Sequence, residues 1–250
     1  ARKRLSKLTN LDGSLGARAN LWFARVFSRP AKPNYDQAAA SLEPAVKKYQ
    51  NVTPVNDDLR FDYANALMSR NEPDWKTATE ALGKINGRAF GQFAEVLAQR
   101  ATCYHKLGDY NNSLNLANEH LTKFKEHEMA GDTRFLRAEN MFLLSQGDSA
   151  IEAYKEFLAT HKDHSNALAA AFRIAQIHHH QGRWDQSLAS AGPLLASKPE
   201  GPLFAQLAFL VGNSHFQKEQ WKECLEPLEA FIATRVKKTG KNNQRVSAEA

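Results

Sequence analysis

The sequence predicts an all-α solenoid of about six antiparallel helix hairpins, and the spacing of small and aromatic residues carries this prediction. Phenylalanine recurs every 37 residues, at Phe135, Phe172 and Phe209. A small residue stands three positions after each of them: Ala138, Ala175 and Gly212. A second small-residue series has the same interval: Ala150, Ser187 and Cys224. Self-similarity with a period of roughly 20–50 residues is typical of repeat proteins.

Residues 93–124 show one repeat clearly. A first helix is expected from Phe93 to Lys106. The turn that follows contains Gly108, which can take the left-handed conformation that ends a helix, and Asp109, which can cap the next one. The second helix then places apolar residues at intervals of three and four, the pattern of one buried stripe: Leu114, Leu116, Ala117, Leu121 and Phe124.

The same two-helix pattern recurs along the chain. An aromatic residue ends the turn in five of six repeats: Tyr35, Trp75, Tyr110, Trp184 and Trp221. The fourth repeat has a shorter turn, for which we expect Gln146-Gly147-Asp148.

This pattern resembles the tetratricopeptide repeat family, which pairs a small residue late in helix A with a small residue early in helix B, twelve positions later. Four repeats keep the interval of twelve: 101 to 113, 138 to 150, 175 to 187 and 212 to 224. In the first two repeats the interval is fourteen, from Ala24 to Ala38 and from Ala64 to Ala78. The resemblance covers residues 14–235 and implies a right-handed superhelical solenoid whose concave wall consists of the A helices.

The period of 37 residues exceeds the period of about 34 that is usual in that family. We expect the extra residues to lengthen the loop between repeats. Arg100 and Arg137 also stand where the family prefers leucine. The longer period loosely resembles the repeats of bacterial cell-envelope lipoproteins of the barrel-assembly and cell-division coordinator types. Cytoplasm and periplasm or cell envelope both remain open as compartments.

Three segments are expected. Residues 1–13 form a basic segment or the remnant of a preceding helix, and residues 14–235 form the repeat array. Residues 236–250 form a basic linker, in which Asn243 could begin a further repeat. We therefore expect a piece of a longer repeat protein. No run of 18 apolar residues is present, and no signal peptide is visible.

The sequence predicts a non-catalytic protein without a cofactor. It contains no phosphate-binding loop, dinucleotide fingerprint, zinc-protease motif or serine-hydrolase elbow. His178, His179 and His180 are adjacent on one helix and cannot converge on one ion, so no metal site is predicted. Cys103 and Cys224 lie about three repeats apart and are expected to be buried rather than bridged.

The resemblance implies that residues three before, one after and four after the helix-A small residue face the concave groove. The predicted partner-binding residues are Phe61, Asn65, Thr102, His105, Phe135, Phe142, Phe172, Gln176, His179, Phe209, Asn213 and Phe216. Aromatic area with interspersed amides suits a peptide or a helix of a partner protein. The alternative is that the phenylalanines only pack against neighbouring hairpins.

Two other functions remain open. The net charge is +6, with basic residues concentrated at both ends, so a repeat module that binds nucleic acid or an anionic surface is the first alternative. Nucleic acid is disfavoured because the predicted groove is aromatic rather than basic. The second alternative is a non-catalytic part of a larger enzyme.

Overall fold

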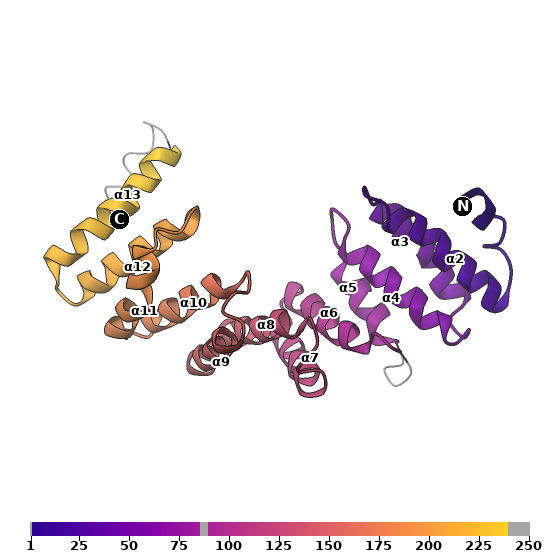
Figure 1. Cartoon of the computed structure of the whole chain (residues 1–250), viewed down its shortest axis with the longest axis horizontal. Coiled ribbons are helices and arrows are strands. Elements are labelled where there is room, and N and C mark those ends of the chain that lie inside the picture. Colours follow the sequence, from indigo (N-terminus) through magenta and orange to yellow (C-terminus); the bar gives the residue numbers. More distant parts are fainter. Residues whose placement is uncertain (1, 86–89, 240–250) are drawn as a thin grey trace. The chain divides into compact units, whose positions relative to one another are not determined.

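The computed structural model describes residues 2–85 and 90–239 and is helical throughout, with no strand in this part of the chain (Figure 1). It divides into two compact units, Ala1–Asn140 and Met141–Ala250, which are treated separately below. The helices are α1 (Arg2–Leu5), α2 (Gly13–Ser28), α3 (Tyr35–Lys48), α4 (Val55–Met68), α5 (Trp75–Gly83), α6 (Phe93–Lys106), α7 (Tyr110–Lys123), α8 (Ala130–Leu143), α9 (Gly147–Thr160), α10 (Ala167–His180), α11 (Trp184–Ala196), α12 (Pro202–Gln217) and α13 (Trp221–Thr239).

Helices α2 to α13 follow one another as the paired helices of six consecutive hairpins, and successive helices pack against each other from α2 to α7 in the first unit and from α9 to α13 in the second. The predicted all-α solenoid of six hairpins is therefore confirmed. Helix α6 has the predicted bounds, Phe93–Lys106. The predicted basic linker lies partly in α13, which continues to Thr239, and the further repeat predicted from Asn243 falls outside the described residues.

The small residues of each hairpin are buried where its two helices cross. Ala101 and Ser113 are both fully buried, and the Ser113 hydroxyl donates to the Ala101 carbonyl over 2.8 Å. In the last hairpin a Cβ on Gly212 would lie 2.7 Å from Leu228 Cγ. Short side chains at these positions thus let the paired helices approach closely, as the resemblance implied.

The turn inside each of the third to sixth hairpins places one residue in the left-handed region. The four residues lie 37 positions apart: Gly108 (φ 79°), Ser145 (φ 60°), Gly182 (φ 70°) and Glu219 (φ 58°). The expectation for the fourth turn is corrected: Gly147 is the first residue of α9, and Ser145 makes the turn. In the third hairpin Asp109 accepts from the Asn112 amide over 3.1 Å and caps α7, as predicted.

Polar links join successive hairpins at a position that is apolar elsewhere. In the first unit Asn140 donates from Nδ2 to Ser113 Oγ over 2.7 Å, and both side chains are fully buried. In the second unit Ser214 Oγ donates to Ser187 Oγ over 3.3 Å at the equivalent position. Between them in the chain, the equivalent residues are Ala150 and Ile177, which are also buried.

Exposed ion pairs add a second link between neighbouring hairpins. An aspartate at the start of helix B pairs with a basic residue at or just after the end of the next helix A. The pairs are Asp36 with Arg70 (2.6 Å), Asp148 with Arg183 (2.7 Å) and Asp185 with Lys218. Exposed pairs of this kind contribute about 0–1 kcal/mol each.

His120 is a buried histidine at the end of α7. Its side chain is fully buried, and neither ring nitrogen has a hydrogen-bond partner among the described residues. Its ring lies edge-on to His127, at 5.7 Å between centroids. Burial lowers the pKa of His120, and the positive charges of His127 and Arg134 add to this effect against the opposing charge of Glu95.

The stability of the first unit is therefore expected to fall as the pH drops below about 6.5, where an exposed histidine takes up a proton. Because the pKa of His120 is lowered in the folded state, the unfolded state binds more protons in this range. Proton binding therefore stabilises the unfolded state relative to the folded state. Phe157 occupies the equivalent position one repeat later, and His120→Phe should flatten the dependence between about pH 7 and 5. Urea denaturation across this range measures it, and an unchanged slope in the variant would contradict the assignment.

Two further observations concern membrane spans and the cysteines. Within residues 2–85 and 90–239, no helix combines the length and hydropathy that a bilayer crossing requires. Cys103 and Cys224 are buried and unbridged, and burial raises the pKa of the Cys103 thiol to about 11. Both cysteines therefore act as small buried residues.

Candidate partner-binding site

A hollow of about 410 Å³ opens between α10, α12 and α13 in the unit Met141–Ala250. We call it the aromatic hollow. Its lining residues are Phe172, Gln176, His179, His180, Gln206, Phe209, Leu210 and Phe231. Four of the predicted partner-binding residues therefore share one surface: Phe172, Gln176, His179 and Phe209.

Aromatic and aliphatic side chains form the walls of this hollow. The rings of Phe209 and Phe231 lie 5.2 Å apart at 50° to each other. Phe172 packs against the buried cluster that contains Leu207 and Leu210, so the wall on the α10 side is anchored in the core. Phe209 is 38% exposed and presents its ring to solvent.

The polar groups of the hollow are held by hydrogen bonds. Gln176 Oε1 accepts from Arg173 Nη1 over 2.8 Å. His179 Nε2 lies 2.9 Å from Asn213 Oδ1, which places the ring proton on Nε2 because an amide oxygen only accepts. The His179 ring also meets Trp184 edge-on at 5.0 Å. The pKa of the neighbouring His178 is lowered, first by burial and then by the charges of Arg183 and Lys155, against the opposing charge of Asp148.

A second hollow, of about 390 Å³, lies beside Phe142 in the same unit. Leu143, Gly147, Ile177 and Gln181 contribute to its lining, and His180 borders both hollows. The Arg173 guanidinium lies over the Phe142 ring at 4.9 Å. Phe142 thus belongs to an apolar surface next to the aromatic hollow. Asn213 is half-buried as the partner of His179, and Phe216 is exposed and meets Trp221 edge-on at 5.3 Å.

The predicted residues of the first unit lie differently. Phe61 is only 6% exposed and packs against Phe90, so it belongs to the core of that unit. Thr102 donates to the Ala98 carbonyl of its own helix over 3.0 Å. His105 Nδ1 lies 2.8 Å from Asn140 Oδ1 and extends the polar link described above. Asn65 and Phe135 are half-buried.

Four lining residues of the aromatic hollow were not predicted: His180, Gln206, Leu210 and Phe231. Leu210 and Gln206 lie on helix A but outside the three positions that the resemblance supplied. Phe231 comes from helix B of the last repeat, from which no groove residue was expected. Phe231 stands 37 residues after Leu194, so both are apolar at the same repeat position. This regularity could have pointed to Phe231 in the sequence.

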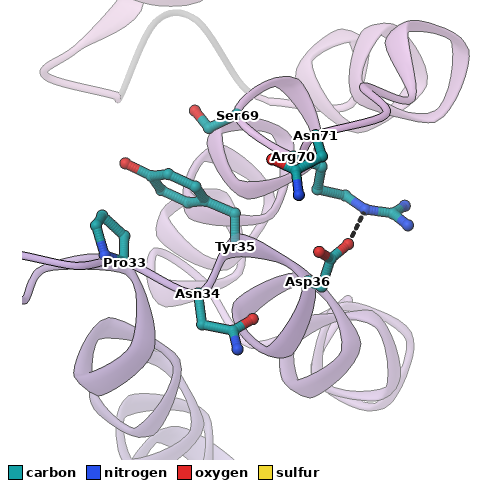
Figure 2. A pocket seen from close by; sticks show the side chains of 7 residues that line it. All are labelled: Pro33, Asn34, Tyr35, Asp36, Ser69, Arg70 and Asn71. Atoms are coloured by element: carbon teal, nitrogen blue, oxygen red, sulfur yellow. Dashed lines mark hydrogen bonds and ion pairs between the residues drawn. The ribbon is translucent and has the colours of Figure 1, made fainter.

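A third hollow, of about 220 Å³, is polar and lies between the start of α3 and the residues that follow α4 (Figure 2). Figure 2 shows Arg70 reaching across to the carboxylate of Asp36, at 2.6 Å. Asn34 caps α3 by accepting from the Gln37 amide over 2.9 Å. Its charged pair therefore links α3 to the end of α4, and its cap stabilises the start of α3.

Among the described residues, no three histidine, cysteine, aspartate or glutamate side chains gather as a metal site would require. The arrangement that the second unit does offer is an aromatic surface with ordered amides. Such a surface can bind apolar side chains and peptide groups.

Comparison with known proteins supports the repeat assignment. Residues 144–202 match the family model described as tetratricopeptide repeat. A tetratricopeptide repeat protein from Parabacteroides merdae ATCC 43184 superposes with a TM-score of 0.63 at 17% identity, covering 88% of this chain and 84% of that chain. MamA from Desulfovibrio magneticus RS-1 superposes with a TM-score of 0.61 at 14% identity, covering 74% of this chain and 97% of that one.

Comparison with curated protein sequences gives no match. The structural likeness, at these identities, shows a common fold and not a common partner. The family match over residues 144–202 and the structural likeness together show that the chain has the tetratricopeptide repeat fold.

Proposed function

We propose that the chain is a non-catalytic scaffold that holds a peptide or helix of a partner protein against its A helices, with the aromatic hollow as the central contact. The tetratricopeptide repeat fold itself suggests a protein–protein interaction scaffold. The observation that carries the finer proposal is the aromatic hollow of about 410 Å³ with Phe172, Phe209 and Phe231 in its walls.

The hollow suits one or two apolar side chains of a partner. Aromatic walls supply large contact area at small cost in conformational entropy, because each ring has few rotatable bonds. Gln176 and Gln206 at the same site can pair with peptide groups beside the inserted side chain. A partner with a leucine or aromatic anchor and a free backbone on either side fits this arrangement.

A peptide library displayed on phage tests the proposal. Selection on the intact chain should enrich peptides with an apolar anchor, and Phe209→Ala should weaken a selected peptide at least about tenfold in calorimetric titration. Phe209 is exposed, so the variant should keep its helicity. Leu168→Ala is a matched control, since Leu168 is similarly exposed on α10 but does not line the hollow.

Binding should also change little with salt, because no aspartate, glutamate, lysine or arginine is among the described residues that line the hollow. A steep loss of affinity with salt would favour a basic surface and an anionic ligand instead. Selected peptides that bind the Phe209→Ala variant as tightly as the parent chain would overturn the proposed site.

A further inference from the structure

The first residue of helix B is aromatic in five of the six hairpins: Tyr35, Trp75, Tyr110, Trp184 and Trp221. In the third, fifth and sixth hairpins its ring packs against the ring of the residue five positions earlier, near the end of helix A. The ring pairs are His105 with Tyr110 (5.6 Å), His179 with Trp184 (5.0 Å) and Phe216 with Trp221 (5.3 Å). Two rings thus pack together at the turn of each of these hairpins.

The fourth hairpin carries only one ring of this pair. Phe142 stands at the helix A position, 37 residues after His105 and 37 before His179. Gly147 begins α9, where tyrosine or tryptophan begins the neighbouring B helices. The second hollow, of about 390 Å³, is lined by both Phe142 and Gly147. It therefore lies where the missing ring would pack.

Side chains of the next hairpin narrow this space without filling it. A Cβ on Gly147 would lie 2.8 Å from Gln181 Nε2 and 3.1 Å from Ile177 Cγ2. Ile177 is larger than Asn140 and Ser214, its equivalents one repeat to either side. Both Ile177 and Gln181 nevertheless line the hollow. They cover the backbone of Gly147, and the space beside Phe142 stays open.

The surroundings of this space suit an aromatic ring. Phe142, Leu143 and Ile177 supply apolar walls, and no aspartate, glutamate, lysine or arginine is among the described residues that line it. Gln181 donates from Nε2 to Asp148 over 3.3 Å, so its amide oxygen can accept from an indole N–H or a phenol O–H. Leu143 is 40% exposed, so the hollow is open to solvent.

We propose that the second hollow binds a tryptophan or tyrosine side chain of a partner, which takes the place of the missing turn ring. The repeats of the chain itself define this occupant, because Tyr110 and Trp184 supply the ring in the hairpins before and after. A ring packed on Phe142 gains the stabilisation of an aromatic pair in addition to its buried area.

The assignment of this ring to a partner protein rests on the proposed function, whereas the space for the ring rests on the repeat geometry. His180 borders both the second hollow and the aromatic hollow. One peptide can therefore place an apolar anchor in the aromatic hollow and a ring in the second hollow.

Titration with N-acetyltryptophanamide, followed by amide NMR of the 250-residue chain, tests the proposal without a peptide. The signals of Gly147 and Ile177 should shift and saturate with a dissociation constant of about 1 mM or below, as expected for a ligand of this size. N-acetylalaninamide, which has no ring, should leave them unchanged. Equal shifts with both compounds, or no saturable shift at about 10 mM of the tryptophan compound, would overturn the proposal.

Two variants locate the binding in the second hollow. Gly147→Trp supplies the ring from the chain itself and should abolish the shift at Ile177; the flexible end of Gln181 can turn away to make room. Leu143→Asp is the second variant should Gly147→Trp lose helicity, and its carboxylate should weaken binding at least about fivefold. Leu168→Asp is the matched control, since Leu168 is also 40% exposed but lines neither hollow. Binding that persists unchanged in both hollow variants would overturn the proposal.

Phe209→Ala separates this site from the aromatic hollow. The shifts at Gly147 and Ile177 should persist in this variant, because Phe209 does not line the second hollow. Shifts that Phe209→Ala removes would place the probe in the aromatic hollow and would overturn the inference without harming the proposed function. Conversely, shifts that persist while phage selection yields no peptide would count against the proposed peptide contact alone.

Discussion

Replacement of Gly212 by valine is expected to destabilise the unit Met141–Ala250 by about 2–3 kcal/mol. A Cβ at this position would lie 2.7 Å from Leu228 Cγ and 3.2 Å from the Leu228 backbone nitrogen. The backbone of α13 would have to move, because a branched side chain has no other space between the two helices. Urea denaturation followed by circular dichroism measures the loss.

Gly192 provides the matched control. It also lies inside a helix, α11, but apart from its chain neighbours and the backbone of α11 a Cβ there would meet no atom within 4 Å. Gly192→Ala should therefore change the free energy of unfolding by less than about 1 kcal/mol, because the lower backbone entropy of the unfolded chain favours alanine while the following Pro193 disfavours a Cβ in helical backbone. Equal effects of substitution at the two glycines would contradict the close packing described for the last hairpin.

Asn140→Ile is expected to destabilise the unit Ala1–Asn140 by about 2–3 kcal/mol. The substitution removes the donor to Ser113 Oγ and the acceptor beside His105, and it leaves the Ser113 hydroxyl buried with one partner fewer. The difference in free energy of unfolding between the parent chain and the variant is measured by chemical denaturation of the intact chain. The transition is followed through a signal that is intrinsic to this unit.

The repeat itself suggests the compensating change. Ile177 and Ala150 occupy the equivalent pair of positions one repeat later, and both are buried. Ser113→Ala combined with Asn140→Ile reproduces that apolar pair, so the double variant should recover much of the lost stability. A double variant as unstable as the sum of the single variants would show that the two side chains do not act as a pair.

Much of the fold could be predicted because the crossing of paired helices depends on the size of individual side chains. The crossing of two helices tolerates only short side chains, so Ala101, Ser113, Ala138 and their equivalents mark each hairpin in the sequence. The end of α6 at Lys106 followed from the turn that contains Gly108 and Asp109. The fourth turn was placed wrongly because the prediction relied on Gly147, whereas the repeat spacing places Ser145 in the left-handed conformation.

The candidate site was less predictable because exposure depends on neighbours outside the repeat pattern. Phe61 and Phe209 hold the same repeat position, yet Phe90 covers Phe61 and Phe209 remains exposed. Phe231 lines the aromatic hollow from α13, a helix B, where its ring packs against Phe209. A rule that assigns groove residues by repeat position alone treats all hairpins alike and misses both differences.

The left-handed residue in the turns of the third to sixth hairpins has a consequence for how the sequence of such an array can change. Glycine adopts this conformation freely, whereas a residue with a Cβ pays about 1–2 kcal/mol for it. Ser145 and Glu219 nevertheless adopt it where Gly108 and Gly182 do. The packing of the two helices therefore selects the turn, and the turn residue only modulates its cost. Such an array can lose its turn glycines one at a time while its architecture persists, and its sequence signature then survives mainly in the small residues at the helix crossings.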